Sequence, residues 1–139
     1  MERQLVSSGS PLEPTIGFSR AVRLGPYVAI SGTAPIGADG HAAHVGNVYE
    51  QTKLCLSIIR RAVEGCGCAM EDVIRTRIML TDMDSWKDAA RAHGETFHAI
   101  RPACTFVQVV RFIDPDWLVE VEADCGDQGE VGTIGPMDD

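Results

Sequence analysis

The chain has 139 residues, 45% of them hydrophobic, which is enough for one domain with its own core and too few for two. Its 12 basic and 20 acidic residues give a formal net charge of −8. Proteins that bind nucleic acids usually carry a basic patch, because their affinity depends on releasing counterions from phosphates. The composition therefore argues against nucleic acid as a partner.

The longest segment without a charged residue, 24–38, contains prolines and glycines and is shorter than the ~20 residues of a membrane helix. The first ten residues have no apolar stretch behind a basic start, unlike a secretory signal. We therefore expect a cytoplasmic protein without a membrane partner. Five cysteines, an odd number, without an export signal predict reduced thiols rather than a disulfide framework.

Residues 18–32 carry the first clear pattern. Two runs of β-branched and aromatic residues flank Gly25-Pro26, and this arrangement predicts a β-hairpin. The following segment, 33–46, is rich in Gly and Ala and contains Pro35. It predicts an irregular loop or a short edge strand.

A helix is predicted to begin at Asn47, which lies three residues before Glu50 in the arrangement of a capping box. It should run to about Val63 and end where Gly65 adopts the left-handed conformation. Apolar residues recur at helical spacing. The face expected to be buried consists of Cys55, Leu56, Ile59, Ala62 and Val63.

Residues 73–80 alternate with period two and predict a strand. The alternation places Ile74, Ile78 and Leu80 on one face and Arg75 and Arg77 on the other. A second helix is predicted to be capped by Asp84 or Ser85 and to end before Pro102. Its expected buried stripe is Trp86, Ala89, Ala90, His93 and Phe97.

Two more strands are predicted, over 104–110 and 117–125, separated by a turn at Asp114-Pro115-Asp116. Glu120, Glu122 and Asp124 should share one strand face and pair with Arg75 and Arg77. We expect a single domain over 1–125 and a disordered acidic tail over 126–139.

The predicted order is therefore β-β-α-β-α-β-β. It indicates an α+β fold, a two-layer sandwich in which a mixed sheet carries both helices on one face. The other sheet face requires cover, which an oligomer would supply.

Several reactive residue types have ordinary explanations. Cys104 has no visible base to activate it, so we favour a small strand residue over a nucleophile. Cys66 and Cys68 lack a second pair at zinc spacing and are assigned to loop packing. His93 is interpreted as a satisfied core or interface histidine. His41 and His44 are expected to be solvated, and no metal site is predicted.

Seven motifs in a specific order resemble the RidA family, also called the YjgF, UK114 or L-PSP family of small trimeric proteins, from Gly17 to Cys125. They are Phe18-Ser19-Arg20-Ala21-Val22, Val28-Ala29-Ile30-Ser31-Gly32-Thr33, Gln51-Thr52, Met70-Glu71-Asp72-Val73-Ile74-Arg75-Thr76, Leu80-Thr81-Asp82-Met83, Arg101-Pro102-Ala103-Cys104-Thr105-Phe106-Val107-Gln108-Val109 and Leu118-Val119-Glu120-Val121-Glu122-Ala123. The resemblance implies a chorismate-mutase-like fold and a homotrimer with three clefts between subunits. In the best-known branch it also implies hydrolysis of enamines and imines to keto acids and ammonia without a cofactor.

The resemblance also implies where this chain departs from that branch. The arginine that binds the substrate carboxylate is Cys104 here, the tyrosine of the first strand is Phe18, and the polar residue of the second helix is Ala90. Arg101 is the candidate for a displaced cation. The chain thus resembles an arginine-lacking branch, and we expect little hydrolysis of imines derived from common amino acids.

Glu120 persists and is expected to be the catalytic residue that orients water. The residues expected to bind substrate are Phe18, Ser31, Gly32, Trp86, Ala90, Arg101, Cys104 and Phe106. The first hypothesis is a cofactor-free hydrolase or deaminase that acts on an enamine, an imine or another small electrophile in the cleft between subunits. The alternative is a non-catalytic trimer that binds a metabolite or a partner. Ribonuclease activity, suggested only by family naming, is disfavoured by the net charge.

Overall fold

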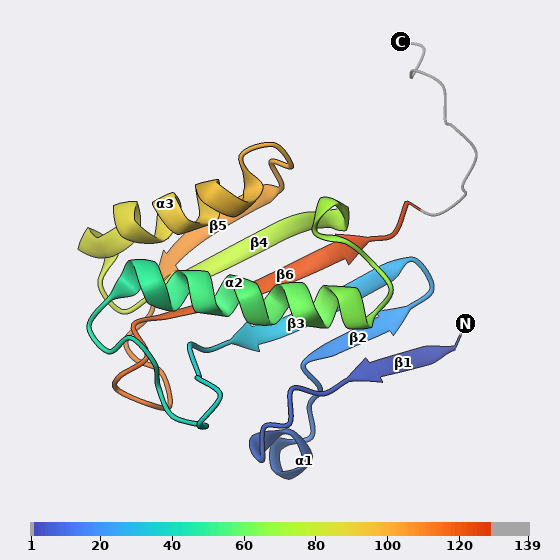
Figure 1. The fold of residues 1–139 in the computed structure, drawn as a ribbon, viewed down its shortest axis with the longest axis horizontal. Helices are drawn as coiled ribbons and strands as arrows, with labels where there is room; N and C mark the ends of the chain where they lie inside the picture. The colour runs from blue at the N-terminus through green and yellow to red at the C-terminus, as the bar shows by residue number, and fades with distance from the viewer. Residues whose placement is uncertain (1, 129–139) are drawn as a thin grey trace.

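The computed structural model describes residues 2–128, so most of the predicted acidic tail lies outside the described residues. A six-stranded sheet with the order β1-β2-β3-β6-β4-β5 forms its centre (Figure 1). The strands are β1 (Arg3–Val6), β2 (Ala21–Leu24), β3 (Tyr27–Thr33), β4 (Val73–Leu80), β5 (Ala103–Gln108) and β6 (Val119–Gly126). The helices are α1 (Leu12–Ile16), α2 (Val48–Gly65) and α3 (Trp86–Phe97), with short 3-10 helices at Met70–Asp72 and Met83–Ser85.

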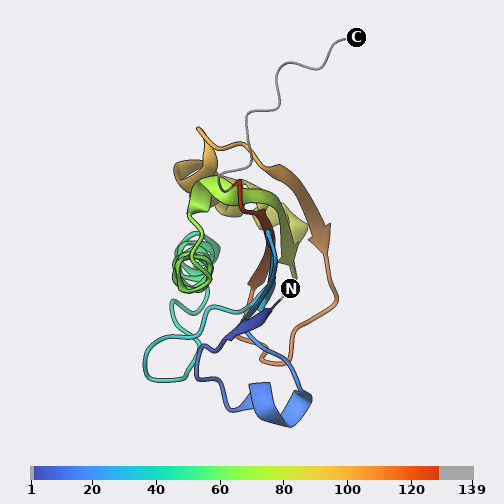
Figure 2. The ribbon, with the colours of Figure 1, turned by 90° about the vertical axis from the view of Figure 1, so that its right-hand side faces the viewer.

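The two long helices, α2 and α3, lie on the same side of the sheet (Figure 2). Strands β4 and β5 pair in parallel and the other neighbouring strands pair antiparallel. The predicted mixed α+β fold is therefore confirmed. The structure adds β1 and α1, which the sequence did not predict.

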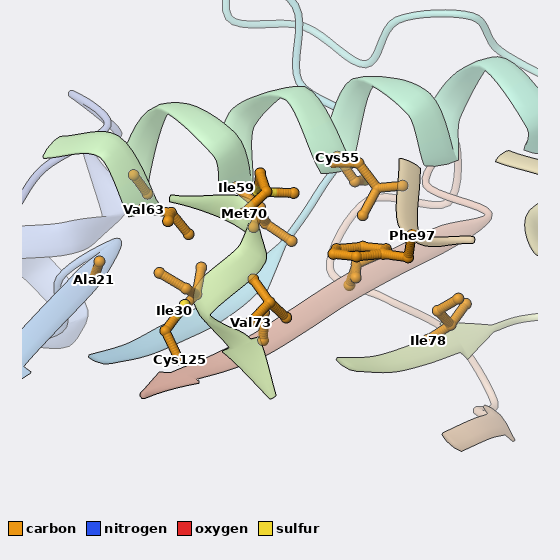
Figure 3. Packing of buried hydrophobic residues seen from close by; sticks show 14 of the residues in the cluster. Ala21, Ile30, Cys55, Ile59, Val63, Met70, Val73, Ile78, Phe97 and Cys125 are labelled. Carbon is orange, nitrogen blue, oxygen red and sulfur yellow. The ribbon is translucent and has the colours of Figure 1, made fainter. Parts of the chain in front are cut away.

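Residues of α2 and of the sheet form one hydrophobic core (Figure 3). Ile59 and Val63 of α2 lie over the sheet, and Phe97 of α3 belongs to the same cluster. The helix begins as predicted, since Asn47 Oδ1 accepts a hydrogen bond of 3.0 Å from the backbone N–H of Glu50. The predicted buried face is confirmed, with Cys55, Leu56, Ile59, Ala62 and Val63 all buried.

The helix α2 does not end as predicted. Gly65 is still helical, because the N–H of Cys66 continues the ladder to the carbonyl of Ala62 at 3.1 Å. The left-handed residue is Gly67, with φ of 79°, and it turns the chain back after Cys66.

Two residues predicted to be buried are exposed. Ile74 is 55% exposed because a bulge between Val73 and Arg75 inserts an extra residue opposite β6, and an extra residue reverses the alternation of faces. Val73 takes the buried place instead. Trp86 is 45% exposed because it is the first residue of α3, where it packs on Phe106 at the sheet edge. Neither predicted capping residue caps α3, since Ser85 occupies the N-cap without a side-chain hydrogen bond to it.

The sheet face away from the helices, called the open face below, carries the predicted ion pairs. Arg77 pairs with Glu122, and Arg75 Nε lies 4.0 Å from Asp124 Oδ2. At the far end of β6, Asp127 pairs with Arg23 at 2.5 Å. Strand β6 thus ends at Gly126, and the next residue, Asp127, still contacts the rest of the fold.

Candidate functional site

The residues predicted for the site lie in two groups, and the first surrounds Glu120 on β6. Val119 and Val121 belong to the core, so Glu120 between them faces the open side of the sheet. Gly32 of β3 lies next to it, because a Cβ on Gly32 would stand only 3.8 Å from Glu120 Oε1. A bulge between Ile30 and Thr33 brings the backbone this close. The Glu120 carboxylate and the Ser31-Gly32 backbone therefore lie side by side.

Arg20 joins this first group, although the sequence assigned it no role. Its side chain is 8% exposed, and its Nη1 donates hydrogen bonds to the carbonyl of Gly32 at 2.6 Å and to Thr33 Oγ1 at 3.1 Å. The guanidinium carbon lies 5.4 Å from the centre of the Phe18 ring. Arg20 thus contacts both the Phe18 ring and the Gly32 backbone beside Glu120. A lone arginine next to a strand gives no sequence signal of burial, since its burial depends on tertiary contacts.

The segment 18–20 is held to β3 by further hydrogen bonds. Ser31 Oγ donates to the carbonyl of Ser19 at 2.5 Å, and the Ser31 N–H donates to the carbonyl of Arg20 at 3.0 Å. The predicted substrate-binding residue Ser31 therefore uses its hydroxyl within the chain. Its contribution to a ligand site lies in fixing this backbone.

In the first group, burial and the neighbouring charges shift the pKa values of Glu120 and Arg20 in opposite directions. Burial raises the pKa of Glu120 above its usual value, and the positive charge of Arg20 offsets part of this rise. Burial likewise lowers the pKa of Arg20, whereas Glu13 and Glu120 raise it. Glu13 itself is buried and accepts hydrogen bonds from Ser8 and Ser10. A partly buried carboxylate of raised pKa is a suitable general base near neutral pH.

The second group lies at the β5 edge of the sheet. In the parallel register Cys104 is beside Thr76, and Phe106 is beside Ile78. Thr76 and Ile78 are buried on the helix side, so Cys104 and Phe106 face that side too. Trp86 packs edge to face on Phe106 with the ring centres 6.4 Å apart.

Helix α3 supplies the remaining predicted residues of the second group. Ala90 is partly buried on it, and His93 Nε2 lies 2.8 Å from Thr76 Oγ1 with its ring 4.7 Å from that of Phe97. This agrees with the interpretation of His93 as a satisfied histidine. Burial lowers its pKa, which favours the neutral imidazole.

Arg101 lies between α3 and β5 and belongs to neither group. Its φ is 58°, and its backbone N–H closes the end of α3 on the carbonyl of Phe97 at 2.8 Å. Within residues 2–128 its exposed side chain makes no hydrogen bond or ion pair. Its proposed role as a displaced cation stays a prediction.

The structure therefore does not bring all the predicted site residues together in one chain. Glu120, Gly32 and Phe18 belong to the first group, whereas Cys104 and Phe106 face the other side of the sheet. Strand β4 lies between β6 and β5. A cleft that contains both groups needs a second copy of the chain.

The remaining cysteines and histidines do not form a site. Cys66 and Cys68 are buried, and Arg23 donates to the Cys66 carbonyl at 2.7 Å and to Cys68 Sγ at 3.3 Å. All five cysteines are free, and His41 and His44 are exposed. No group of three or more metal-ligating side chains in residues 2–128 could hold a metal ion. Among the same residues, no helix is both long and apolar enough to cross a membrane.

The chain is a small α+β protein with a six-stranded mixed sheet. Two long helices cover one face of the sheet, and candidate site residues lie on both faces. The family model described as "Endoribonuclease L-PSP" matches residues 9–125. The chain belongs to this family, whose members are also called RidA, YjgF or UK114 proteins.

Relatives share most of the chain. SCO2049 of Streptomyces coelicolor, described as an uncharacterized protein, is 40% identical over 120 residues, which cover 86% of this chain and 89% of the relative. The RutC family protein PH0854 of Pyrococcus horikoshii is 28% identical over 88% of this chain and 96% of its own. The crystal structure of Rv2704 from Mycobacterium tuberculosis, a member of the YjgF/YER057c/UK114 family, has a TM-score of 0.81 and 40% identity, and covers 90% of this chain and 99% of that one.

Proposed function

We propose that the protein is a homotrimer that binds a small molecule in clefts between its subunits and hydrolyses a C=N bond there. The observation that carries this proposal is the placement of the Glu120 and Cys104 groups on opposite faces of one sheet. If the β5 edge of one copy packs against the open face of the next, both groups line the same cleft. A ring of three copies repeats this contact and closes it.

The open face supports assembly because it presents apolar side chains beside its charges. Leu5 is 58% exposed and Tyr27 is 67% exposed, and Ile74 and Leu24 lie on the same face by register. Contiguous exposed apolar surface of this kind usually marks an interface. Sedimentation equilibrium tests the assembly: we expect a particle of about 45 kDa, three copies of the 15.0 kDa chain, and a 15.0 kDa monomer at micromolar concentration would refute it.

The proposed chemistry assigns Glu120 the role of general base. Its carboxylate takes a proton from a water molecule as the water oxygen bonds to the carbon of the C=N group, and the carboxyl so formed gives this proton to the nitrogen. The carboxylate then takes the hydroxyl proton of the tetrahedral carbinolamine and passes it to the nitrogen as the C–N bond breaks, which leaves a carbonyl compound and an amine or ammonia. No cofactor is required in this sequence of steps.

The charges favour a neutral or cationic substrate. The thiol of Cys104 supplies no positive charge, and Arg20 is buried and already faces Glu13 and Glu120. A substrate carboxylate would lose its hydration beside Glu120 without gaining a cation, which is unfavourable. We therefore propose imines or enamines without a carboxylate group.

Comparative turnover tests this function. Imines with and without a carboxylate are generated in the assay, and the appearance of the carbonyl product is followed for the wild type and for Glu120→Gln. We expect hydrolysis of the uncharged imines and its loss in the variant. No turnover with any imine, together with saturable binding of one, would favour the alternative of a non-catalytic binding module. The apolar or thiol side chains of Phe18, Ala90 and Cys104, which replace polar residues of the family, also support this alternative. Ribonuclease activity is disfavoured by the net charge of −8.

A further inference from the structure

We propose that Arg20 is a positioning residue of this site, which fixes the Ser31-Gly32 bulge of β3 beside Glu120 and places a positive charge near that carboxylate. The inference rests on the proposed role of Glu120. It concerns a residue that none of the motifs above assigns to the cleft, and it follows from the contacts of the guanidinium.

Arg20 is bonded to the bulge of β3. Arg20 Nη1 contacts three consecutive residues: the carbonyl of Ser31 at 3.5 Å, the carbonyl of Gly32 at 2.6 Å and Thr33 Oγ1 at 3.1 Å. Those residues form the bulge that brings Gly32 against Glu120. By binding both carbonyls, the guanidinium fixes the direction of this backbone and so the distance from Gly32 to the carboxylate.

Arg20 also contributes to the charge balance around Glu120. The charged and titratable groups around it are Arg20 from the segment before β2, Cys55 from α2 and Glu122 on its own strand, and Glu122 is paired with Arg77. Arg20 is thus the one cation among these groups whose charge acts on Glu120. Without it, burial alone would favour the protonated carboxyl, which cannot accept a proton from water.

Packing alone does not account for a buried arginine at this position. A buried arginine that only filled space would be replaced without loss by an apolar side chain, because burying the charge is costly. Arg20 is only 8% exposed, and its Nε has no hydrogen-bond partner among the described residues. The unpaired Nε adds to the cost of this burial, which the Nη1 hydrogen bonds to Gly32 and Thr33 and the negative charges of Glu13 and Glu120 offset.

The test is a pH titration of the Glu120 side-chain carboxyl by carbon-13 NMR on the full chain, which needs no substrate. In Arg20→Gln we expect the pKa of Glu120 to rise by about one unit, a tenfold gain in proton affinity. Arg20→Lys keeps the charge but loses the planar fork, so we expect a smaller rise. Arg77→Gln is the matched control, because it removes a cation from the open face that pairs with Glu122, and it should leave the pKa of Glu120 nearly unchanged.

A folded Arg20→Gln protein with an unchanged pKa of Glu120 would overturn the inference, as would an equal rise in Arg77→Gln. If Arg20→Gln does not fold, the reciprocal variant decides. In Glu120→Gln the hydrogen exchange of the Arg20 guanidinium should become several-fold faster, because the negative charge that acts on it is gone, and an unchanged exchange rate would refute the coupling. Absence of imine turnover would refute the proposed function and leave this titration result as it stands.

Discussion

Replacing Gly32 by alanine tests the site next to the Glu120 carboxyl without disturbing the fold. Gly32 does not adopt a positive φ, and the nearest atoms to an added Cβ would be those of the Glu120 carboxyl, at 3.8 to 4.0 Å, which is ordinary van der Waals contact. Gly→Ala at a compatible position stabilises a protein by ~0.4–1 kcal/mol through the unfolded state. Gly32→Ala should therefore keep the free energy of unfolding or raise it slightly.

The same methyl group should impair the site. The methyl group covers the side of the carboxylate where a water molecule would approach. Because the carboxylate then has less contact with solvent, the pKa of Glu120 should rise further. We expect turnover or ligand affinity to fall at least tenfold, measured by the imine assay beside a urea unfolding curve. Gly94→Ala on α3 is the control, since nothing lies within 4 Å of its added Cβ, and it should gain ~0.5–1 kcal/mol with unchanged turnover. Unimpaired turnover in a folded Gly32→Ala protein would refute the placement of the cleft at Gly32.

Three other predictions concern Glu120, Cys104 and His93. Glu120→Gln should lower kcat by ~10²–10⁴-fold with little change in KM, whereas Glu122→Gln, which loses only the partly exposed ion pair with Arg77, should leave both constants nearly unchanged; equal losses in a steady-state assay would contradict the assignment. Cys104→Arg should raise the hydrolysis of imines that carry a carboxylate, and the absence of any gain in the coupled imine assay would show that this charge is not what the cleft lacks. Because burial lowers the pKa of His93, the unfolded chain binds more protons as the pH falls below about 6.5. The free energy of unfolding should then decrease until His93 is protonated in the folded state too, and urea unfolding at several pH values should show a smaller decrease in His93→Gln.

Local patterns predicted those elements whose determinants are close in sequence. The Gly25-Pro26 turn, the start of α2 at Asn47 and the bounds of β4 depend on turn chemistry, a capping side chain and a period-two alternation. Each of these acts within a few residues. The structure agrees with all three.

The failures depend on contacts between distant segments. The bulge that exposes Ile74 is defined by the pairing of β4 with β6, and no pattern within residues 73–80 reveals it. Strand β1 has only four residues and acquires its structure by pairing with β2. Arg20 packs against residues 31–33 of the neighbouring strand, and the negative charges of Glu13 and Glu120 act on it from α1 and β6. The resemblance supplied Glu120 and Gly32, but it could not show that Cys104 and Glu120 lie on opposite faces of one chain.

Thiol cross-linking between positions 104 and 120 tests most directly whether the cleft lies between subunits. Among the described residues the native cysteines other than Cys104 are buried, so Glu120→Cys adds a second thiol on the opposite sheet face. With a short bifunctional thiol reagent we predict covalent dimers and trimers on a denaturing gel, and none in the matched Glu120→Cys, Cys104→Ser chain. Uncross-linked or only internally linked monomers at micromolar concentration would contradict the account.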